Sequence, residues 1–269
     1  MPIRKTYEFE RVAGAKVGRL NQGINTQFIV YRIDETVIDT GPSNQWRHVK
    51  QFLSPKPVEQ LLLTHHHEDH SGNAHRISVT HGVLPRAPAL AQEKLANGYK
   101  TPFLQKLVWG SLVPVETQTL KEEEFLADGS RIIPVHTPGH AKDLTCFFLP
   151  DQGYFFSGDL FIARKLKMLR SDENLQQLVE SIQKVLKLDF KTLFCPHGGV
   201  IEDGKVALQQ KLDNILETCE KAQSLHKEGM GLDDITHQIL GPEDMVAKLT
   251  GGNFCKMNLV RQGIELKLS

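Results

Sequence analysis

The sequence predicts an α/β protein that is built on mixed β-sheets and carries a helical extension at its C-terminal end. Short apolar runs bounded by Gly, Pro, Asn or Asp alternate with amphipathic segments as far as about residue 200. Hairpin-like and crossover-like connections both occur, so the sheets need strands of both directions. From about residue 203 onward, amphipathic helices are expected instead. We therefore expect two domains, an α/β domain over residues 1–204 and a helical domain over residues 205–269.

The first predicted elements are two short strands in residues 26–40, joined by the turn Asp34–Glu35. Gly41 and Pro42 then break the strand, and apolar residues at helical spacing predict a helix that the segment "SPKP" ends. The run "VEQLLLT" lacks alternation, which is typical of a strand covered on both faces. Three more elements are predicted next: a helix over 71–82, a strand at Val83–Leu84, and helix with loops over 86–118.

Four apolar runs in the second half of the chain predict strands: "GSRIIPVHTPGH", "LTCFFLP", "GYFFSGD" and "KTLFCPHGG". Residues 172–188 place their apolar side chains on one stripe, which predicts a helix. A long amphipathic helix is expected from Gly204 to Gly229, because glycine commonly ends a helix. Two or three short helices follow, separated by Gly–Pro and Gly–Gly pairs.

The composition is that of an ordinary globular protein, with 40% hydrophobic and 24% charged residues. Basic and acidic residues both number 32, so broad attraction to nucleic acids or anionic membranes is not expected. The four cysteines show no CxxC spacing, which favours reduced thiols in a cytosol. No signal-peptide pattern or membrane-length apolar run is present. We expect a cytoplasmic protein with a small-molecule substrate and without a membrane or nucleic-acid partner, and a homodimer stays open.

Four histidines and two acids crowd residues 65–70, directly after an apolar strand. Side chains two positions apart share a side in an extended segment, so His65, His67 and Asp69 can converge on one point. His70 begins the next element. Imidazole nitrogens and carboxylate oxygens are the ligands that suit zinc, iron or manganese. The stretch therefore predicts a metal site rather than a solvated histidine-rich loop.

Two members of this cluster, His66 and Glu68, are not expected to bind the metal. His66 points away from its neighbours in an extended segment, and Glu68 does the same. One cluster cannot complete a metal site alone, so further ligands are needed from elsewhere in the chain.

Three more ligand-type residues follow a strand and a tight turn, as the first cluster does. They are His140 in "HTPGH", Asp159 in "SGD" and His197 in "PHGG". Each one alone would be read as ordinary turn chemistry. Enzymes built on sheets gather their sites at the carboxyl ends of strands, so the three together with the first cluster predict one shared site.

The order and identity of these motifs resemble those of the metallo-β-lactamase superfamily of metallohydrolases. The resemblance covers about residues 20–200 and rests on five segments: His-x-His-x-Asp-His at 65–70, "HTPGH" at 136–140, "SGD" at 157–159, "PHGG" at 196–199 and "VIDTG" at 37–41. It implies an αβ/βα four-layer sandwich of two mixed β-sheets, with helices outside and the site along one sheet edge.

The resemblance also implies a ligand set for two divalent metal ions, zinc first, with iron or manganese as alternatives. The first ion would be held by His65, His67 and His140. The second would be held by Asp69, His70 and His197, with Asp159 bridging the two. The implied activity is a hydrolase in which a metal-bridging hydroxide attacks an acyl or phosphoryl centre. Asp69 is the expected catalytic residue of this set.

Departures from two known branches narrow the choice of branch within the superfamily. The true β-lactamases that resemble this signature carry Cys at the position of Asp159. The nuclease-like branch usually carries a large extra domain, for which the stretch between Asp159 and His197 has no room. A hydrolase of a small ester, thioester or lactone remains the prediction. Its alternatives are a mononuclear iron oxidoreductase that resembles persulfide dioxygenases and a nuclease-like phosphodiesterase.

Two points near the site stay open at this stage. Arg164 and Lys165 belong to a basic segment after Asp159, which would be either a solvated loop or an anion clamp for substrate. Asp143 would either orient His140 or another ligand, or lie at the surface.

Overall fold

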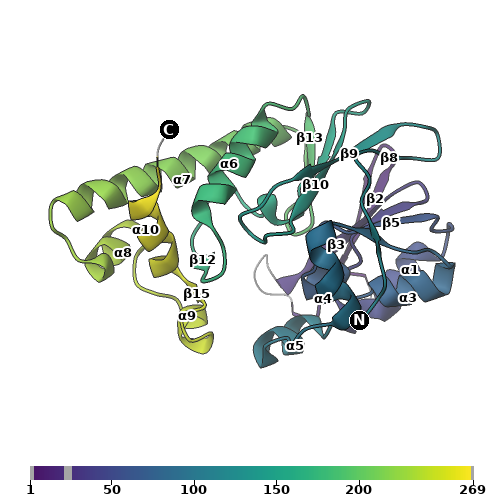
Figure 1. The fold of residues 1–269 in the computed structure, drawn as a ribbon, viewed down its shortest axis with the longest axis horizontal. Helices are drawn as coiled ribbons and strands as arrows, with labels where there is room; N and C mark the ends of the chain where they lie inside the picture. Colours follow the sequence, from purple (N-terminus) through teal and green to yellow (C-terminus); the bar gives the residue numbers. More distant parts are fainter. Residues whose placement is uncertain (1–2, 21–25, 268–269) are drawn as a thin grey trace. The chain divides into compact units, whose positions relative to one another are not determined.

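The computed structural model describes residues 3–20 and 26–267, which form two compact units (Figure 1). The first unit consists of three segments: Met1–His136, Asp143–Ile162 and Phe190–Gly204. The second consists of Thr137–Lys142, Ala163–Asp189 and Lys205–Ser269. The predicted boundary after residue 204 is also a boundary between these units, but the second unit includes two earlier segments. As the limit of a separate domain, that boundary stays a prediction.

A seven-stranded mixed sheet forms one half of the first unit. Its strands lie side by side in chain order: β1 (Lys5–Phe9), β2 (Val12–Val17), β3 (Phe28–Ile33), β4 (Thr36–Ile38), β5 (Gln60–Leu62), β6 (Arg86–Ala87) and β7 (Gln118–Thr119). Pairing is antiparallel from β1 to β4 and parallel from β4 to β7. The parallel half places the ends of β4 and β5 at one edge, and the motif segments follow these ends.

The second sheet of this unit is six-stranded and also mixed. Its order is β14 (Gly199–Ile201), β13 (Thr192–Cys195), β11 (Tyr154–Phe156), β10 (Thr145–Leu149), β9 (Arg131–His136) and β8 (Glu124–Phe125). Only β11 and β13 pair in parallel within this described sheet. The apolar runs that predicted strands in the second half of the chain all lie here.

The helices of the first unit are α1 (Trp46–Leu53), α2 (Glu68–Ser71), α3 (Ala74–His81), α4 (Gln92–Asn97) and α5 (Phe103–Trp109), with 3₁₀ turns η2 (Ser43–Gln45), η3 (Ala89–Ala91) and η4 (Gly158–Leu160). The predicted strand at Val83–Leu84 is wrong. Gly82 ends α3 in a left-handed conformation, and the chain first pairs with β5 at Arg86. The short strands β1 and β2 were not predicted.

Two apolar cores explain why β3 reads as a continuous hydrophobic run. Ile29, Tyr31 and Ile33 pack between the two sheets, together with Phe156 and other residues of the second sheet. Side chains on the opposite face of β3 pack instead with residues of α1, α3, α4 and α5. Burial on both faces removes the usual alternation of polar and apolar residues. The expected class of two mixed sheets with outer helices is therefore confirmed.

The second unit is mainly helical. It contains α6 (Leu175–Leu186), α7 (Gly204–Lys227), α8 (Leu232–Leu240), α9 (Met245–Leu249) and α10 (Lys256–Glu265), with a small ribbon of β12 (Leu169–Arg170) and β15 (Phe254–Cys255). The α6 helix starts later than predicted because the Asn174 side chain accepts a hydrogen bond from the Gln177 amide and caps it. Among the helices of the described residues, none has the length and apolar character needed to cross a membrane.

We predict that Phe156→Ala lowers the free energy of unfolding by about 3–5 kcal/mol, because it leaves a cavity in a closed core. The Phe156 side chain is 1% exposed and stacks on Phe194 between the sheets. Phe125→Ala is the matched control, since Phe125 is 51% exposed. Urea unfolding curves of both variants measure the difference. Equal losses in the two variants would contradict the assignment of the inter-sheet core.

Candidate metal centre

The predicted metal-ligand segment is tied to the end of the neighbouring strand by Asp39. Asp39 Oδ1 accepts a hydrogen bond from the Thr64 amide at 2.8 Å, and Oδ2 accepts one from Thr64 Oγ1 at 2.8 Å. Oδ2 also lies 2.7 Å from His70 Nδ1. Asp39 is buried and has a positive φ of 57°, a conformation that Asp tolerates better than most residues. One carboxylate therefore holds both the start and the end of the His-rich segment.

Sequence reasoning missed this role of Asp39. The available signal was the carboxylate in "VIDTG", placed where a strand ends beside the strand that carries the histidines. Which side chains it would meet was not readable, because Asp39 and Thr64 become neighbours only through parallel pairing of β4 and β5.

Asp159 is brought to the same corner by Gly158. Gly158 has a positive φ of 43°, and a Cβ built there would lie 3.2 Å from Thr64 Cβ. Only glycine allows this close approach at a positive φ without strain. The adjacent Asp159 is buried at the start of η4, so its carboxylate is close to the histidine segment.

His197 follows β13 and is oriented by the backbone of Gln27. Its Nδ1 lies 2.9 Å from the Gln27 carbonyl oxygen, which makes Nδ1 the donor. Its Nε2 then faces two carboxylates, at 3.2 Å from Asp159 Oδ1 and 3.7 Å from Asp69 Oδ2. The ring is therefore held with Nε2 toward the two carboxylates, an orientation that also suits a metal-binding imidazole.

His70 has the same arrangement. Asp39 occupies its Nδ1, while its Nε2 lies 3.1 Å from Asp159 Oδ1 and 3.9 Å from Asp69 Oδ2. This buried Nε2 makes no hydrogen bond in good geometry with any residue that the structure describes. A buried polar atom without a partner is costly unless a ligand satisfies it.

The pKa values of both imidazoles reflect the crowding of acids. Burial pushes the pKa of His70 down, but Asp159, Asp39 and Asp69 outweigh it and raise the pKa well above its usual range. For His197, Asp159 and Asp69 likewise overcome burial and raise the pKa. The two buried carboxylates thus require positive charge on or beside these rings, and a divalent cation would supply it.

Two groups of ligand atoms in the first unit lie close enough to share an ion. Within each, the atoms are within 4.8 Å of one another. The groups are His65, His70 and Asp159, and Asp69, His70 and His197. His67 lies beside them, with its Nδ1 at 2.8 Å from His65 Nε2. The donor set therefore fits divalent metal ions of the zinc type.

Three predicted site residues belong to the second unit. His140 Nδ1 pairs with Glu173 Oε1, a partner that sequence reasoning missed. Arg164 donates from Nε to Gln210 Oε1 at 2.8 Å, and Lys165 is exposed. The predicted roles of these three residues in metal and substrate binding stay predictions.

His66 and Glu68 are in neither of the two groups, but both are buried and bonded. His66 Nδ1 lies 2.9 Å from both Asp143 oxygens, and Asp143 also accepts from the His66 amide at 2.8 Å. Burial raises the pKa of Asp143, but its hydrogen bonds with His66 outweigh this and lower the pKa. Asp143 therefore holds the middle of the His-rich segment and is not a surface residue.

The chain belongs to the metallo-β-lactamase superfamily, since residues 24–197 match the family profile described as "Metallo-beta-lactamase superfamily". It is 27% identical over 208 residues to the Aspergillus fumigatus protein named "Atrochrysone carboxyl ACP thioesterase", covering 76% of this chain and 60% of that relative. A protein of the same name from Claviceps purpurea is 23% identical over 248 residues, covering 86% and 71%. The chain thus spans only about 60% of the length of the first relative.

Solved structures show the same fold. A metallo-beta-lactamase family protein from Thermus thermophilus aligns with a TM-score of 0.68 at 16% identity, covering 96% of this chain and 93% of that one. A beta-lactamase domain protein from Burkholderia ambifaria aligns with a TM-score of 0.69 at 16% identity, covering 96% and 89%. The family and the sandwich that the motifs predicted are therefore confirmed.

We predict that Asp39→Asn lowers zinc affinity about 10- to 100-fold, because it removes the carboxylate that orients His70. Asp34→Asn is the matched control. Asp34 also has a positive φ, of 50°, but its carboxylate pairs with Arg11 on the surface. Competition with a chromophoric chelator measures both affinities. Unchanged affinity in Asp39→Asn would exclude an orienting role for Asp39.

Proposed function

We propose that this protein is a metal-dependent hydrolase that cleaves thioester bonds with the help of two divalent cations, zinc being the first choice. The single observation that carries the proposal is that the Nε2 atoms of His70 and His197 face the same two carboxylates. Each ring has its Nδ1 held by a protein acceptor, and each Nε2 faces Asp69 and Asp159. Such backing of imidazoles by acceptors is the usual device for orienting metal ligands.

The proposed ligands are divided between two ions. His65, His67 and His140 would hold one, Asp69, His70 and His197 would hold the other, and Asp159 would bridge them.

Metal ions bound here would supply Lewis-acid chemistry, lowering the pKa of a water molecule and polarising the carbonyl that is attacked. The protein's own residues then have defined tasks. Asp69 is the more exposed of the two carboxylates, with 13% of its side chain accessible against 7% for Asp159. Asp69 would bind the second ion through one carboxylate oxygen and, through the other, would orient the attacking water and accept its proton.

A thioester is the favoured bond for two reasons. A thiol has a pKa of about 8.5, so a thiolate leaves near neutral pH without needing a general acid. The relatives from Aspergillus fumigatus and Claviceps purpurea are named as thioesterases. Small esters and lactones remain within the reach of the same site.

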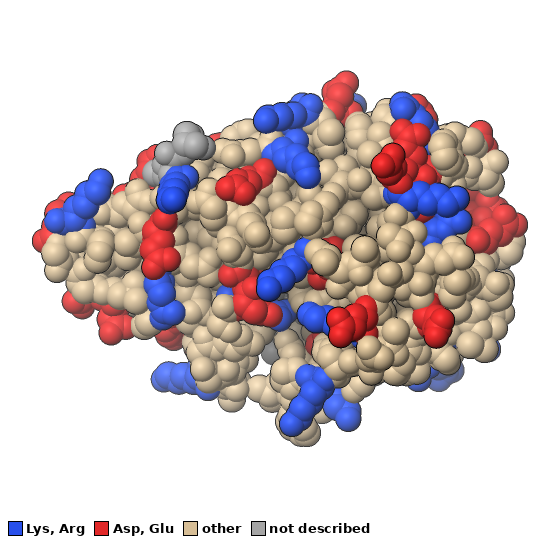
Figure 2. All heavy atoms as spheres, in the orientation of Figure 1, with Lys and Arg blue, Asp and Glu red and all other residues tan. Residues whose placement is uncertain are grey.

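The nuclease alternative receives little support from the charges. The ion pair between Arg170 and Asp172 offsets one positive charge of this basic segment, and the Arg164 guanidinium is bonded to the neutral Gln210. On the face drawn in Figure 2, acidic and basic side chains are interspersed. Binding of nucleic acid generally needs a basic surface of one sign.

We predict that Asp69→Ala lowers kcat/KM for an acyl-thioester of N-acetylcysteamine by about 100-fold or more, the usual contribution of a proton acceptor. Asp128→Ala is the control, because Asp128 pairs with Arg11 on the surface. Release of thiol, followed with a chromogenic disulfide reagent, measures turnover. Full activity in Asp69→Ala would remove Asp69 from the mechanism.

We also predict that the purified protein binds two zinc ions per chain, because the seven proposed ligands are more than the four that a single zinc ion usually takes. Elemental analysis after dialysis against zinc gives the count, and removal by a chelator should abolish thioester cleavage until zinc is restored. One iron per chain together with oxygen uptake would instead establish the oxidoreductase alternative.

A further inference from the structure

We propose that Lys94 is an anion-binding residue of the substrate site, whose ammonium group holds a carboxylate or a phosphate of the thioester substrate. The inference rests on the proposed function for the thioester itself. It assigns a charged recognition element to the segment between β6 and β7, where the sequence revealed no functional residue.

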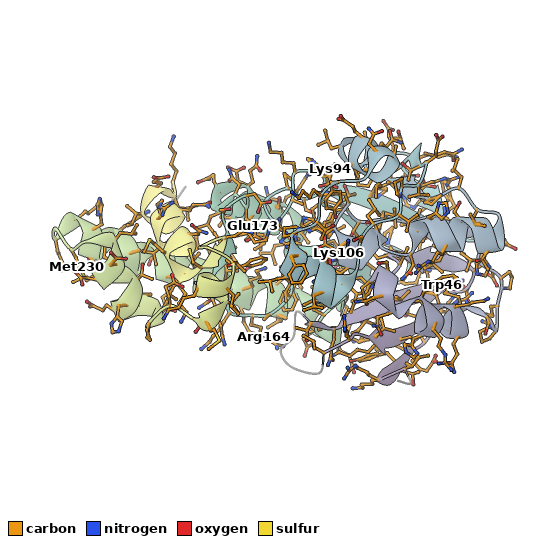
Figure 3. All side chains as sticks on the ribbon, turned by 90° about the horizontal axis from the view of Figure 1, so that it is seen from below. Trp46, Lys94, Lys106, Arg164, Glu173 and Met230 are labelled. Carbon is orange, nitrogen blue, oxygen red and sulfur yellow. The ribbon has the colours of Figure 1, made fainter. Side chains whose placement is uncertain are left out.

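The Lys94 ammonium is held in position by the buried pair of His66 and Asp143. Lys94 Nζ lies 2.9 Å from His66 Nε2, and His66 Nδ1 lies 2.9 Å from both oxygens of Asp143. His66 and Asp143 are 6% and 3% exposed, whereas Lys94 is exposed (Figure 3). The Lys94 ammonium at the solvent boundary is therefore held by a series of hydrogen bonds that continues through His66 to the buried Asp143.

The chemistry of this chain determines which way each hydrogen bond runs. Asp143 is an acceptor, so His66 carries its proton on Nδ1 and presents a lone pair at Nε2. Lys94 donates one of its three N–H groups to that lone pair, which leaves two donors for a ligand. Because the side chain is already held in one place, binding an anion costs less conformational entropy than it would for a mobile lysine.

The hydrogen bond to His66 places the Lys94 ammonium next to the proposed metal centre. The His66 ring lies beside the ring of His67, a proposed ligand, with their centroids 4.7 Å apart, and its centroid is 6.4 Å from that of His65. A single imidazole therefore separates the ammonium from the His67 ring.

A second contact holds the same segment against the motif. The Tyr99 hydroxyl lies 3.0 Å from Glu68 Oε2 and 3.2 Å from the His66 carbonyl oxygen, and its ring meets the His66 ring edge-on at 5.3 Å. Lys94 and Tyr99 thus attach α4 and the loop after it to the residues that the sequence suggested were spare. The geometry of the His-rich segment and the position of the Lys94 ammonium are therefore coupled.

The anion could lie on either side of the scissile bond. An ammonium is a compact point charge that accepts a carboxylate or a phosphate oxygen without demanding a planar fork. The acyl group would supply a carboxylate, and the thiol carrier would supply a phosphate. A role limited to anchoring α4 would make no such distinction, since loosening the segment would affect every ligand alike.

Stable thioether analogues test the proposal on the zinc-loaded full chain, with dissociation constants measured by titration calorimetry. The three probes share one thiol carrier core: S-pentylpantetheine is neutral, S-(4-carboxybutyl)pantetheine carries an acyl-side carboxylate, and S-pentyl-coenzyme A carries carrier-side phosphates. Lys94→Met removes the charge and keeps an unbranched side chain. Lys50→Met on α1 removes the same charge from another exposed lysine and serves as the control.

We expect Lys94→Met to weaken binding of one charged probe about tenfold, as for loss of a charge-assisted hydrogen bond near solvent, with the neutral probe unaffected. Loss confined to the carboxybutyl probe identifies an acyl carboxylate, and loss confined to the coenzyme A probe identifies a carrier phosphate. Equal weakening of all three probes, or no weakening at all, would overturn the proposal. Absence of thioester turnover would count against the proposed function alone, because the dissociation constants do not depend on cleavage.

Discussion

The candidate metal centre depends on one buried carboxylate, that of Asp39. It accepts hydrogen bonds from the amide and hydroxyl of Thr64 and holds the Nδ1 of His70. Thr64 and His70 flank the whole His-rich segment, so this carboxylate closes the segment into a loop of defined shape. The arrangement is tolerated because all the interactions are charge-assisted and a satisfied buried carboxylate avoids most of its desolvation cost.

The same electrostatic argument explains why this cluster of side chains favours a bound cation. Asp69 and Asp159 face two imidazoles whose other nitrogens are already committed to protein acceptors. Without a cation, charge balance requires protons on His70 and His197, and their raised pKa values express that demand. A bound divalent cation would meet the same demand, which is why this cluster has the character of a cation-binding site.

Lys94, the residue proposed to bind an anion, comes from a different part of the chain than the proposed metal ligands. The ligands follow strand ends, whereas Lys94 and Tyr99 belong to α4 and the loop after it. Both side chains attach to backbone or side-chain groups of the ligand segment. A loop that varies in sequence can therefore change the substrate while the strand ends preserve the chemistry.

Much of the architecture was predictable from sequence because its signals are local. Apolar runs before tight turns marked the strands β5, β11 and β13, and the spacing of His65, His67 and Asp69 marked the ligand segment. The helix α6 followed from a single apolar stripe, but the sequence placed its start at residue 172, whereas the Asn174 cap starts it at Leu175. The strand predicted at Val83–Leu84 was misplaced because β6 is too short to carry a pattern of its own.

What the sequence determined by itself was the family, the order of the elements and the identity of the ligand-type residues, since each depends on neighbours a few positions apart. Only the tertiary structure decided that Asp39 orients His70, that Gln27 orients His197, and that His66 supports Lys94 instead of standing spare. These partners lie between 28 and 170 positions apart in the chain. Contacts at such separations arise from strand pairing and packing, which no local pattern records.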